Sequence, residues 1–340
     1  MQNFGVRSSR PMSTLRVALV ADELTRSCLE RECHVTNITP LNYRFQLKAR
    51  RPDMLLVESV WQGYGNRWKF RVASYPDHPA RTNQALVRVV EYAKELGIPT
   101  VFWNKEDGVH FDRFVSSARH FDHIFTVDEN CVNKYRKVVA PEVTVNTLMF
   151  AAQPKIHRFE GFNFKYPSAN FTGSYSHHVH DERRQWQDML FKAAGETMGL
   201  TVFDRNSKRK SPNYRYPDFG NMKVRPAVKL AGTASIYKDF LVSLNVNTVV
   251  DSGTMFSRRL IEIIGCGGIA VTTPSHSVDR HFKDYCHVVK SYEEAHELLS
   301  RLSKGPSSKD LEMAEAGARF VAAEHTWSHR LADIAKVVGL

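Results

Sequence analysis

The sequence contains no long hydrophobic run. Its apolar stretches Leu15–Ala21 and Gly267–Val271 are short and end in polar residues, whereas a membrane-spanning helix needs about 20 apolar residues in succession. The first residues, Met1–Met12, are followed by neither the apolar segment nor the small-residue cleavage pattern of a secretory signal. We therefore expect a cytoplasmic protein without a membrane-spanning helix.

Cysteine is scarce and shows no pairing pattern. The chain has an odd number of cysteines and no CxxC pair: Cys28, Cys33, Cys131, Cys266 and Cys286. Neither a disulfide framework nor a zinc site is expected from this spacing, and we predict reduced, mostly buried thiols. Glycine and proline are also too few, at 18 and 14 of 340 residues, for a collagen-like or largely disordered chain.

Acidic residues are outnumbered by basic ones. The chain has 36 Asp and Glu against 47 Lys and Arg, which gives a formal net charge of +11. A positive field of this size favours an anionic partner. Three classes of partner fit: a phosphorylated small molecule, nucleic acid, or an anionic membrane surface.

Short apolar runs alternate with helical patterns along the whole chain, which is typical of parallel sheets with crossover helices. Strands are predicted at Leu15–Ala21, Met54–Val57, Thr100–Trp103, His123–Val127, Val143–Thr147, Ala169–Thr172, Thr201–Asp204, Leu241–Val246, Gly268–Thr272 and His287–Val289. The punctuated stretch Ala152–Ser168 interrupts this alternation and predicts a linker. We expect an α/β protein of two tandem Rossmann-like domains, residues 1–163 and 164–325, followed by a terminal helix at 326–340.

A first candidate site is the segment Asn170–Trp186, where a strand ends in Gly173–Ser174 before a helix that carries Arg183. Free N–H groups at such a junction suit a diphosphate, although the GxGxxG and Walker patterns are absent and an ordinary strand-to-helix turn is the alternative. Three histidines, His177, His178 and His180, lie in the same loop. No carboxylate or cysteine accompanies them at a ligand spacing, so no metal site is predicted.

A second candidate site is the segment Leu244–Thr273. Asn245 closes a strand, Thr254 lies in a loop, Arg259 and Glu262 share one face of a helix, and Gly267–Gly268 lead into the next strand. A surface ion pair beside a glycine C-cap is the alternative interpretation.

The run Arg259-x-x-Glu262-x-x-x-x-Gly267-Gly268, after the strand LNVN, resembles the C-terminal domain of CgeB-like GT-B glycosyltransferases, the spore maturation protein group. Four further segments are similar to motifs of this family: Gly173–Ser174 with Arg183, the tail EHTWSHRL, and in the first half PDMLLVESVWQGYGNRW and VFWNKEDGVHFDRF. The similarity extends over most of the span from Leu15 to Leu331.

The resemblance implies two domains with a cleft between them, and metal-independent transfer of a sugar from a nucleotide-sugar donor, without a cofactor. It assigns the donor to the second domain, where Glu262 would hold the ribose hydroxyls. Residues near the diphosphate or the donor would be Gly173, Ser174, Arg183, Asn245, Thr254, Arg259, Gly267 and Gly268. Related retaining enzymes have a glutamate eight positions before the one that matches Glu262, but this chain has Thr254 there, so the stereochemical outcome stays open.

A general base is expected after the strand Thr100–Trp103, at the carboxyl edge where open α/β sheets bind ligands. Asp107 matches the aspartate of the family and is the first candidate, followed by Glu106 and His110, while a helix-capping role for Asp107 is the alternative. The tryptophans Trp61, Trp68 and Trp103 near this edge suit either stacking on a sugar or the core.

The acceptor implied is a glycan or a lipid-linked molecule of cell-envelope or surface polysaccharide biosynthesis, with a peripheral contact at the inner face of an anionic membrane as an option. The alternative is a nucleic-acid-binding protein or a DNA-modifying glycosyltransferase, suggested by the net charge and the basic segment RNSKRK at 205–210. No recognised nucleic-acid-binding motif accompanies that segment. A third alternative is a scaffold subunit with a vestigial site. The sugar, the nucleotide base and the oligomeric state cannot be derived from the sequence.

Overall fold

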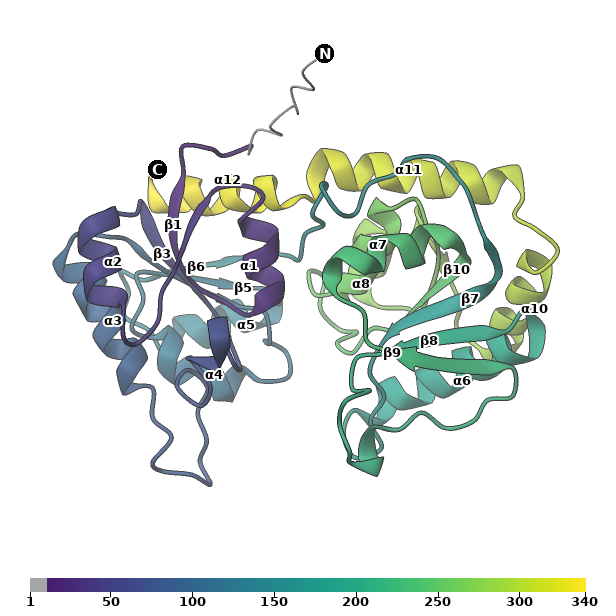
Figure 1. Ribbon diagram of the computed structural model, residues 1–340, viewed down its shortest axis with the longest axis horizontal. Coiled ribbons are helices and arrows are strands. Elements are labelled where there is room, and N and C mark those ends of the chain that lie inside the picture. The colour runs from purple at the N-terminus through teal and green to yellow at the C-terminus, as the bar shows by residue number, and fades with distance from the viewer. Residues whose placement is uncertain (1–10) are drawn as a thin grey trace, which may run out of the picture. The chain divides into compact units, whose positions relative to one another are not determined.

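The computed structural model describes residues 11–340 and divides them into two compact units (Figure 1). Unit 1 consists of residues 11–149 and Trp327–Leu340, and unit 2 is Phe150–Thr326. The expected absence of a secretory signal concerns Met1–Met12. All but the last two of these residues lie outside the described part of the chain. Within residues 11–340, no helix is both long and apolar enough to cross a membrane.

Unit 1 is built on a parallel sheet of six strands in the order β2-β1-β3-β4-β5-β6. The strands are β1 (Arg16–Val20), β2 (His34–Asn37), β3 (Met54–Glu58), β4 (Thr100–Asn104), β5 (His123–Thr126) and β6 (Thr144–Thr147). The central strands β3 and β4 are buried along their whole length. Such strands have near-continuous apolar runs because helices cover both faces of the sheet.

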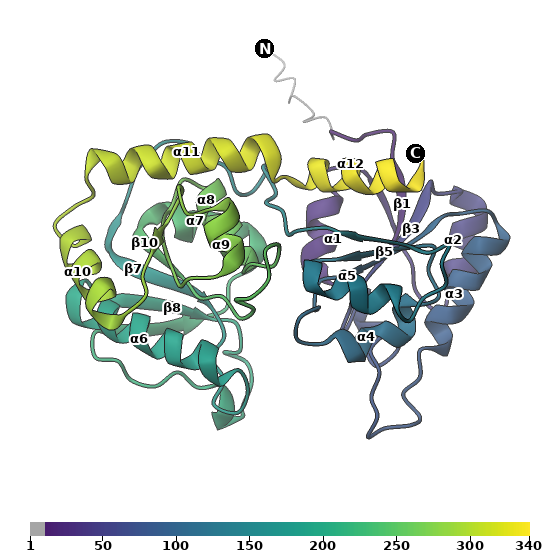
Figure 2. The ribbon, with the colours of Figure 1, turned by 180° about the vertical axis from the view of Figure 1, so that it is seen from behind.

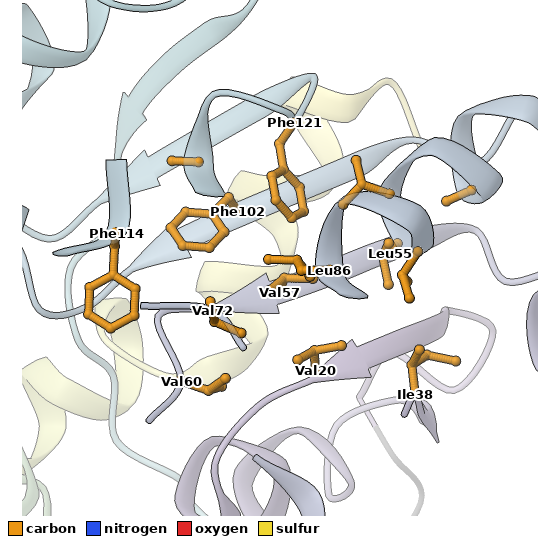
Figure 3. Close-up of a cluster of buried hydrophobic side chains, with 14 of the residues drawn as sticks. Val20, Ile38, Leu55, Val57, Val60, Val72, Leu86, Phe102, Phe114 and Phe121 are labelled. Atoms are coloured by element: carbon orange, nitrogen blue, oxygen red, sulfur yellow. The ribbon is translucent and has the colours of Figure 1, made fainter. Parts of the chain in front are cut away.

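Amphipathic helices cover this sheet. They are α1 (Glu23–Leu29), α2 (Tyr43–Arg50), α3 (Gln84–Glu95), α4 (Phe111–Ala118), α5 (Glu129–Arg136) and α12 (Trp327–Val338), with a 3₁₀ turn η1 at Tyr64–Asn66. Leu86 of α3, Phe114 of α4 and Phe121 pack with strand residues such as Val57 and Phe102 in one buried cluster (Figure 3).

Unit 2 has a second parallel six-stranded sheet in the order β12-β11-β10-β7-β8-β9. Its strands are β7 (Tyr166–Gly173), β8 (Leu200–Asp204), β9 (Met222–Pro226), β10 (Phe240–Asn245), β11 (Ile269–Thr272) and β12 (His287–Val288). The helices are α6 (Asp181–Thr197), α7 (Leu230–Asp239), α8 (Arg258–Gly265), α9 (His276–His281), α10 (Tyr292–Leu302) and α11 (Ser308–Glu324), with a 3₁₀ turn η2 at Pro212–Tyr214. Helices α6 and α10 pack together, as do α8 and α11 (Figure 2).

Every strand predicted from the sequence is present, with ends shifted by up to three residues. The prediction omitted β2 and β9, because neither has an apolar run: β2 is half-exposed and β9 is exposed from Lys223 to Pro226. It also omitted the helices α1, α2, α4 and α9, which have at most eight residues each and are too short to show clear helical periodicity.

The two units divide at Met149 and Phe150, whereas the sequence placed the boundary near Phe164. The intervening segment is irregular but is bonded to unit 2. Ala152 N donates to His325 O at 2.9 Å, and a His157 ring nitrogen lies 2.8 Å from Thr233 Oγ1. At the other end of the chain, α12 is part of unit 1, where Trp327 packs edge-on against Trp103.

Candidate active site

The strand order of unit 2 marks one position for a ligand. From β7 the chain proceeds to β8 and β9 on one side and then crosses to β10 on the other side of β7. This reversal is a topological switch point, and open α/β sheets bind ligands at the carboxyl ends of the strands that flank it. Gly173 ends β7 and Asn245 ends β10, so two residues predicted for the donor lie side by side at this point.

Arg259, from the first turn of α8, crosses the end of β7. Its Nε donates to Thr172 O at 2.5 Å, its Nη1 donates to Asn245 Oδ1 at 3.2 Å, and its guanidinium lies 4.2 Å from the centre of the Phe171 ring. A Cβ atom on Gly173 would lie 2.7 Å from Arg259 Nη2. Glycine is therefore needed at position 173 for this close approach.

Two more guanidinium groups reach the same strand end. Arg183 of α6 donates to Ser174 O and Arg205, directly after β8, donates to Ser174 Oγ, both at 3.3 Å. Burial together with Arg259 and Arg205 lowers the pKa of Arg183 to about 10, and burial also lowers the pKa of Arg259. Within residues 11–340, neither Arg183 nor Arg259 has a carboxylate at ion-pair distance. This cluster, Arg183, Arg205 and Arg259, is a place where an anion would be stabilised.

Two side chains of α9 contact the backbone of the loop before α8. Ser277 Oγ donates to Met255 O at 2.6 Å, and a ring nitrogen of His281 lies 3.1 Å from Gly253 O. Thr254, between these two anchors, is 7% exposed, and its N–H bonds Ser252 Oγ. The structure thus holds Thr254 in a defined loop at the N-terminal end of α8.

Glu262 lies one turn beyond Arg259 on α8. Its side chain is 4% exposed and faces Arg258, whose Nε is 3.4 Å from Glu262 Oε1. The predicted pair of Arg259 and Glu262 on one helix is present, but the ion pair of Glu262 is with Arg258.

Gly267 and Gly268 do not lie with the residues described above. The prediction that they belong to the donor site is therefore corrected. They follow the C-terminal end of α8 and precede β11, so they lie at the amino edge of the sheet rather than at its carboxyl edge. Gly267 has φ +72°, and a Cβ there would lie 2.3 Å from the Phe159 ring. Both glycines are explained by the helix C-cap and by close packing.

Unit 1 has its own switch point between β1 and β3, since β2 and β3 lie on opposite sides of β1. Glu58, at the end of β3, is fully buried and accepts hydrogen bonds from Asp22 N, Thr25 Oγ1 and Lys105 Nζ. Asp22 in turn accepts from the N–H of Gly63 at 2.7 Å. This network connects the loops after β1, β3 and β4.

Asp107, the first candidate for a catalytic base, is completely buried. Its Oδ1 accepts from Asn104 Nδ2 at 2.7 Å and from the Tyr135 hydroxyl at 3.2 Å, while its Oδ2 has no hydrogen-bond partner among residues 11–340. Burial raises the pKa of Asp107 to about 7. This carboxyl bonds Asn104 and Tyr135 within the protein and is less accessible to an acceptor hydroxyl than Glu106 and His110 are.

Glu106 and His110, the two other candidates, remain partly exposed. The His110 ring packs edge-on against Trp61 with 5.3 Å between ring centres, and burial lowers its pKa although Glu106 opposes this shift. The imidazole is therefore neutral at pH 7 and able to accept a proton. Of the three tryptophans, Trp61 is half-buried while Trp68 and Trp103 are core residues.

Sequence reasoning missed two residues of unit 2. Arg205 and Tyr216 belong to the loop after β8, of which the sequence indicated only the basic segment RNSKRK at 205–210. The available signal was that Arg205 directly follows a predicted strand that ends at Asp204. This signal indicates the site only when the strand order, which places β8 beside β7, is known. Two of the three histidines of the loop after β7 bond neighbouring protein groups: His177 bonds backbone groups, and His178 bonds Ser176. Among residues 11–340, no group of three or more potential ligand side chains could hold a metal ion.

Comparison with known proteins bears on the family and the fold of the chain. Residues 178–336 match a family model described as glycosyl transferase-like. No curated protein sequence matches the chain.

Several solved structures share the fold at low sequence identity. An alpha-glucosyltransferase in complex with UDP-glucose and DNA has a TM-score of 0.64 at 12% identity, with 96% of this chain and 100% of that chain covered. Anabaena HepE in complex with UDP and glucose has a TM-score of 0.55 at 10% identity, covering 95% and 91%. Sucrose-phosphate synthase from Thermosynechococcus elongatus has a TM-score of 0.55 at 9% identity, covering 95% and 98%.

These comparisons confirm the expected α/β fold of the GT-B type. The family match, which covers residues 178–336 and thus most of unit 2, indicates the expected enzyme class, a glycosyltransferase. Residues 178–336 are therefore similar to the glycosyl transferase family, and the chain has the fold of the GT-B structures.

Proposed function

We propose that the protein transfers a sugar from a nucleotide-sugar donor whose diphosphate binds at the carboxyl end of β7. The observation that carries this proposal is the cluster of Arg183, Arg205 and Arg259 around Gly173–Ser174. Guanidinium groups bind phosphate oxygens in pairs and stabilise the charge that develops on a departing diphosphate. Three such cations supply this stabilisation without a metal ion, so the proposed reaction is metal-independent.

Glu262 and Thr254 have proposed roles beside this site. Glu262 would accept hydrogen bonds from the ribose hydroxyls after giving up its ion pair with Arg258. Thr254, with Asn245, would lie near the donor sugar. The CgeB-like subtype is part of the same proposal and is supported by the Arg259–Glu262 spacing.

Replacement of Arg259 tests the donor site. Arg259→Ala removes two hydrogen bonds and one positive charge, so the dissociation constant for a nucleoside diphosphate should rise by about 10- to 100-fold. UDP is the first probe, because structural neighbours bind it. Calorimetric titration with UDP, ADP, GDP and dTDP, each with and without EDTA, measures the effect.

A matched control is Arg319→Ala, since Arg319 is an exposed arginine of the same unit and is paired with Glu315. This variant should bind as the wild type does. Equal affinity of Arg259→Ala and the wild type would overturn the donor assignment, and binding that disappears with EDTA would overturn metal independence.

We also propose that His110 accepts the proton of the acceptor hydroxyl. This reverses the order expected from the sequence, because Asp107 is enclosed whereas His110 is partly exposed and neutral. His110→Gln should lower kcat by about 10²- to 10⁴-fold with unchanged affinity for UDP. His120→Gln, at another half-buried histidine of unit 1, is the control. If the His110→Gln variant retains activity, Glu106 becomes the proposed general base instead.

The proposed acceptor is a hydroxyl of a glycan or a lipid-linked sugar, in cell-envelope or surface polysaccharide synthesis. A peripheral membrane contact would suit a lipid-linked acceptor. It is supported by Leu41 and Phe45, which are 81% and 70% exposed and lie beside exposed Arg44 and Lys48. Arg44, Phe45 and Lys48 lie on one face of α2, and Leu41 lies just before the start of this helix.

DNA is the second candidate acceptor, favoured by one basic stretch of unit 2. Between residues 205 and 229 all basic side chains are exposed: Arg205, Lys208, Arg209, Lys210, Arg215, Lys223, Arg225 and Lys229. A polyanion backbone binds such a surface through its phosphates. Two of the structural neighbours are alpha-glucosyltransferases in complex with DNA.

A further inference from the structure

The loop after β8 carries a buried hydroxyl whose bonding is incomplete. The Tyr216 hydroxyl oxygen is buried and has no hydrogen-bond partner in the described part of the chain. Burying a hydroxyl without a partner is costly, because the group gives up its bonds to water. A bound ligand that supplies the missing partner is one reason why a native protein retains such a group.

The surroundings of this hydroxyl define what the partner can be. Arg183, Arg205 and Arg259 all act electrostatically on Tyr216, and the acidic group among its neighbours is Asp204, a buried side chain that accepts the N–H of Asn206. Guanidinium groups only donate, so they cannot accept the phenol proton. Burial is the main cause that raises the pKa of Tyr216, and the nearby Asp204 carboxylate is the second. The Tyr216 hydroxyl therefore stays protonated and can donate a hydrogen bond. The missing partner is therefore an acceptor, and the three cations favour an anionic one.

The ring is held in place by its packing. Tyr216 lies 5.4 Å from Tyr175 and 6.0 Å from Phe191, measured between ring centres. His177 joins the loop after β7 to the loop of Tyr216, since its N–H donates to Asn213 O and a ring nitrogen lies 2.9 Å from Arg215 O. The loop that carries Ser174 and the loop that carries Tyr216 are thereby connected, and the hydroxyl is preorganised.

We propose that Tyr216 is a phosphate-binding residue whose hydroxyl donates a hydrogen bond to a diphosphate oxygen of the nucleotide donor, beside Arg183, Arg205 and Arg259. This inference rests on the proposed donor site and adds a neutral donor to it. The hydroxyl extends the site from the end of β7 to the loop after β8. Its ligand is the diphosphate group, which free pyrophosphate and a nucleoside diphosphate share.

Titration of Tyr216→Phe with UDP, pyrophosphate and uridine tests the proposal. The substitution removes only the oxygen, so affinity for both UDP and pyrophosphate should fall by about tenfold. The melting temperature without ligand should stay the same or rise, because an unpaired buried hydroxyl has been removed. Tyr214→Phe is the matched control, since Tyr214 lies on the same loop and its ring packs against Arg209 and His178.

The outcomes are distinguishable. Wild-type protein that binds neither UDP nor pyrophosphate would overturn the proposed donor site as well as this inference. Wild-type binding with equal affinity in Tyr216→Phe would overturn the role of Tyr216 alone. A loss for UDP but not for pyrophosphate would place the contact on the nucleoside, and a lower melting temperature with unchanged affinity would make the hydroxyl structural.

Discussion

Burial separates residues that the sequence presents as equivalent. Glu106, Asp107 and His110 follow the same strand, yet Asp107 is enclosed with Asn104 and Tyr135 while the other two remain partly exposed. The distance along the chain from β4 is similar for all three. The packing of α5, which supplies Tyr135, helps to enclose Asp107 and leaves the other two partly exposed.

The raised pKa of Asp107 predicts a pH-dependent stability. The neutral carboxyl is favoured in the folded state, so its contribution is fully present below pH about 4 and is lost as the pH rises to about 7. The loss amounts to up to about 4 kcal/mol in the free energy of unfolding. Asp107→Asn should remove this slope, which urea unfolding at several pH values between 4 and 8 measures.

Asp112→Asn is the control for this experiment, because Asp112 is an exposed aspartate on the adjacent helix α4. It should retain the slope of the wild type. Parallel stability curves for the wild type and Asp107→Asn would contradict the assignment of a neutral buried carboxyl.

At the scale of elements, a short helix determines the geometry of a functional loop. The loop between β10 and α8 buries Val246 and Phe256, and Ser277 and His281 of α9 contact its backbone at Met255 O and Gly253 O. The Ser277 side chain is fully buried. The position of Thr254 therefore depends on an element that the sequence pattern did not indicate.

Ser277→Ala tests this coupling between α9 and the loop. Loss of the bond to Met255 O should reduce the free energy of unfolding by about 1–3 kcal/mol. Because the loop is displaced, kcat/KM for the nucleotide sugar should also fall, by about tenfold. Chemical unfolding and steady-state kinetics measure the two effects.

Ser307→Ala separates loss of stability from loss of function. Ser307 caps α11 in the same unit with a reciprocal bond to Asp310, so its replacement should cost about 1 kcal/mol and leave kcat/KM unchanged. An equal loss of kcat/KM in both variants would show that the loop is not held specifically by α9.

At the scale of the whole molecule, the net charge of +11 predicts how the acceptor class can be determined. If DNA is the acceptor, the logarithm of its binding constant should fall steeply with the logarithm of salt concentration, by about 0.9 for each phosphate neutralised. Combined replacement of Lys208, Arg209 and Lys210 by Gln should reduce this slope by about 3. Binding of a fluorescent duplex between 50 and 300 mM salt measures it.

The glycan and lipid alternatives give different results in the same series. If the acceptor is a neutral oligosaccharide, its binding constant should depend little on salt concentration, and DNA should not bind. Co-sedimentation with phosphatidylglycerol vesicles that is lost in Leu41→Ser, Phe45→Ser protein would support the membrane contact. Absence of co-sedimentation in the wild type would remove it.

The sequence by itself determined the class of the fold and most of its strands. Apolar runs bounded by glycine, proline and polar residues specify buried parallel strands locally, since such strands are covered on both faces. The half-exposed β2 and the exposed β9 lack that signal, so they were not predicted. The sequence also indicated Gly173, Ser174, Arg183 and Arg259, because each lies next to a strand end or a helix start.

Only the tertiary structure decided which of these residues meet. Strand order brings the ends of β7 and β10 together at the switch point, and it adds Arg205 and Tyr216 from the loop after β8. It also moves Gly267 and Gly268 to the opposite edge of the sheet and encloses Asp107. These outcomes depend on contacts between segments far apart in the chain, and local pattern specifies an element but not its neighbours.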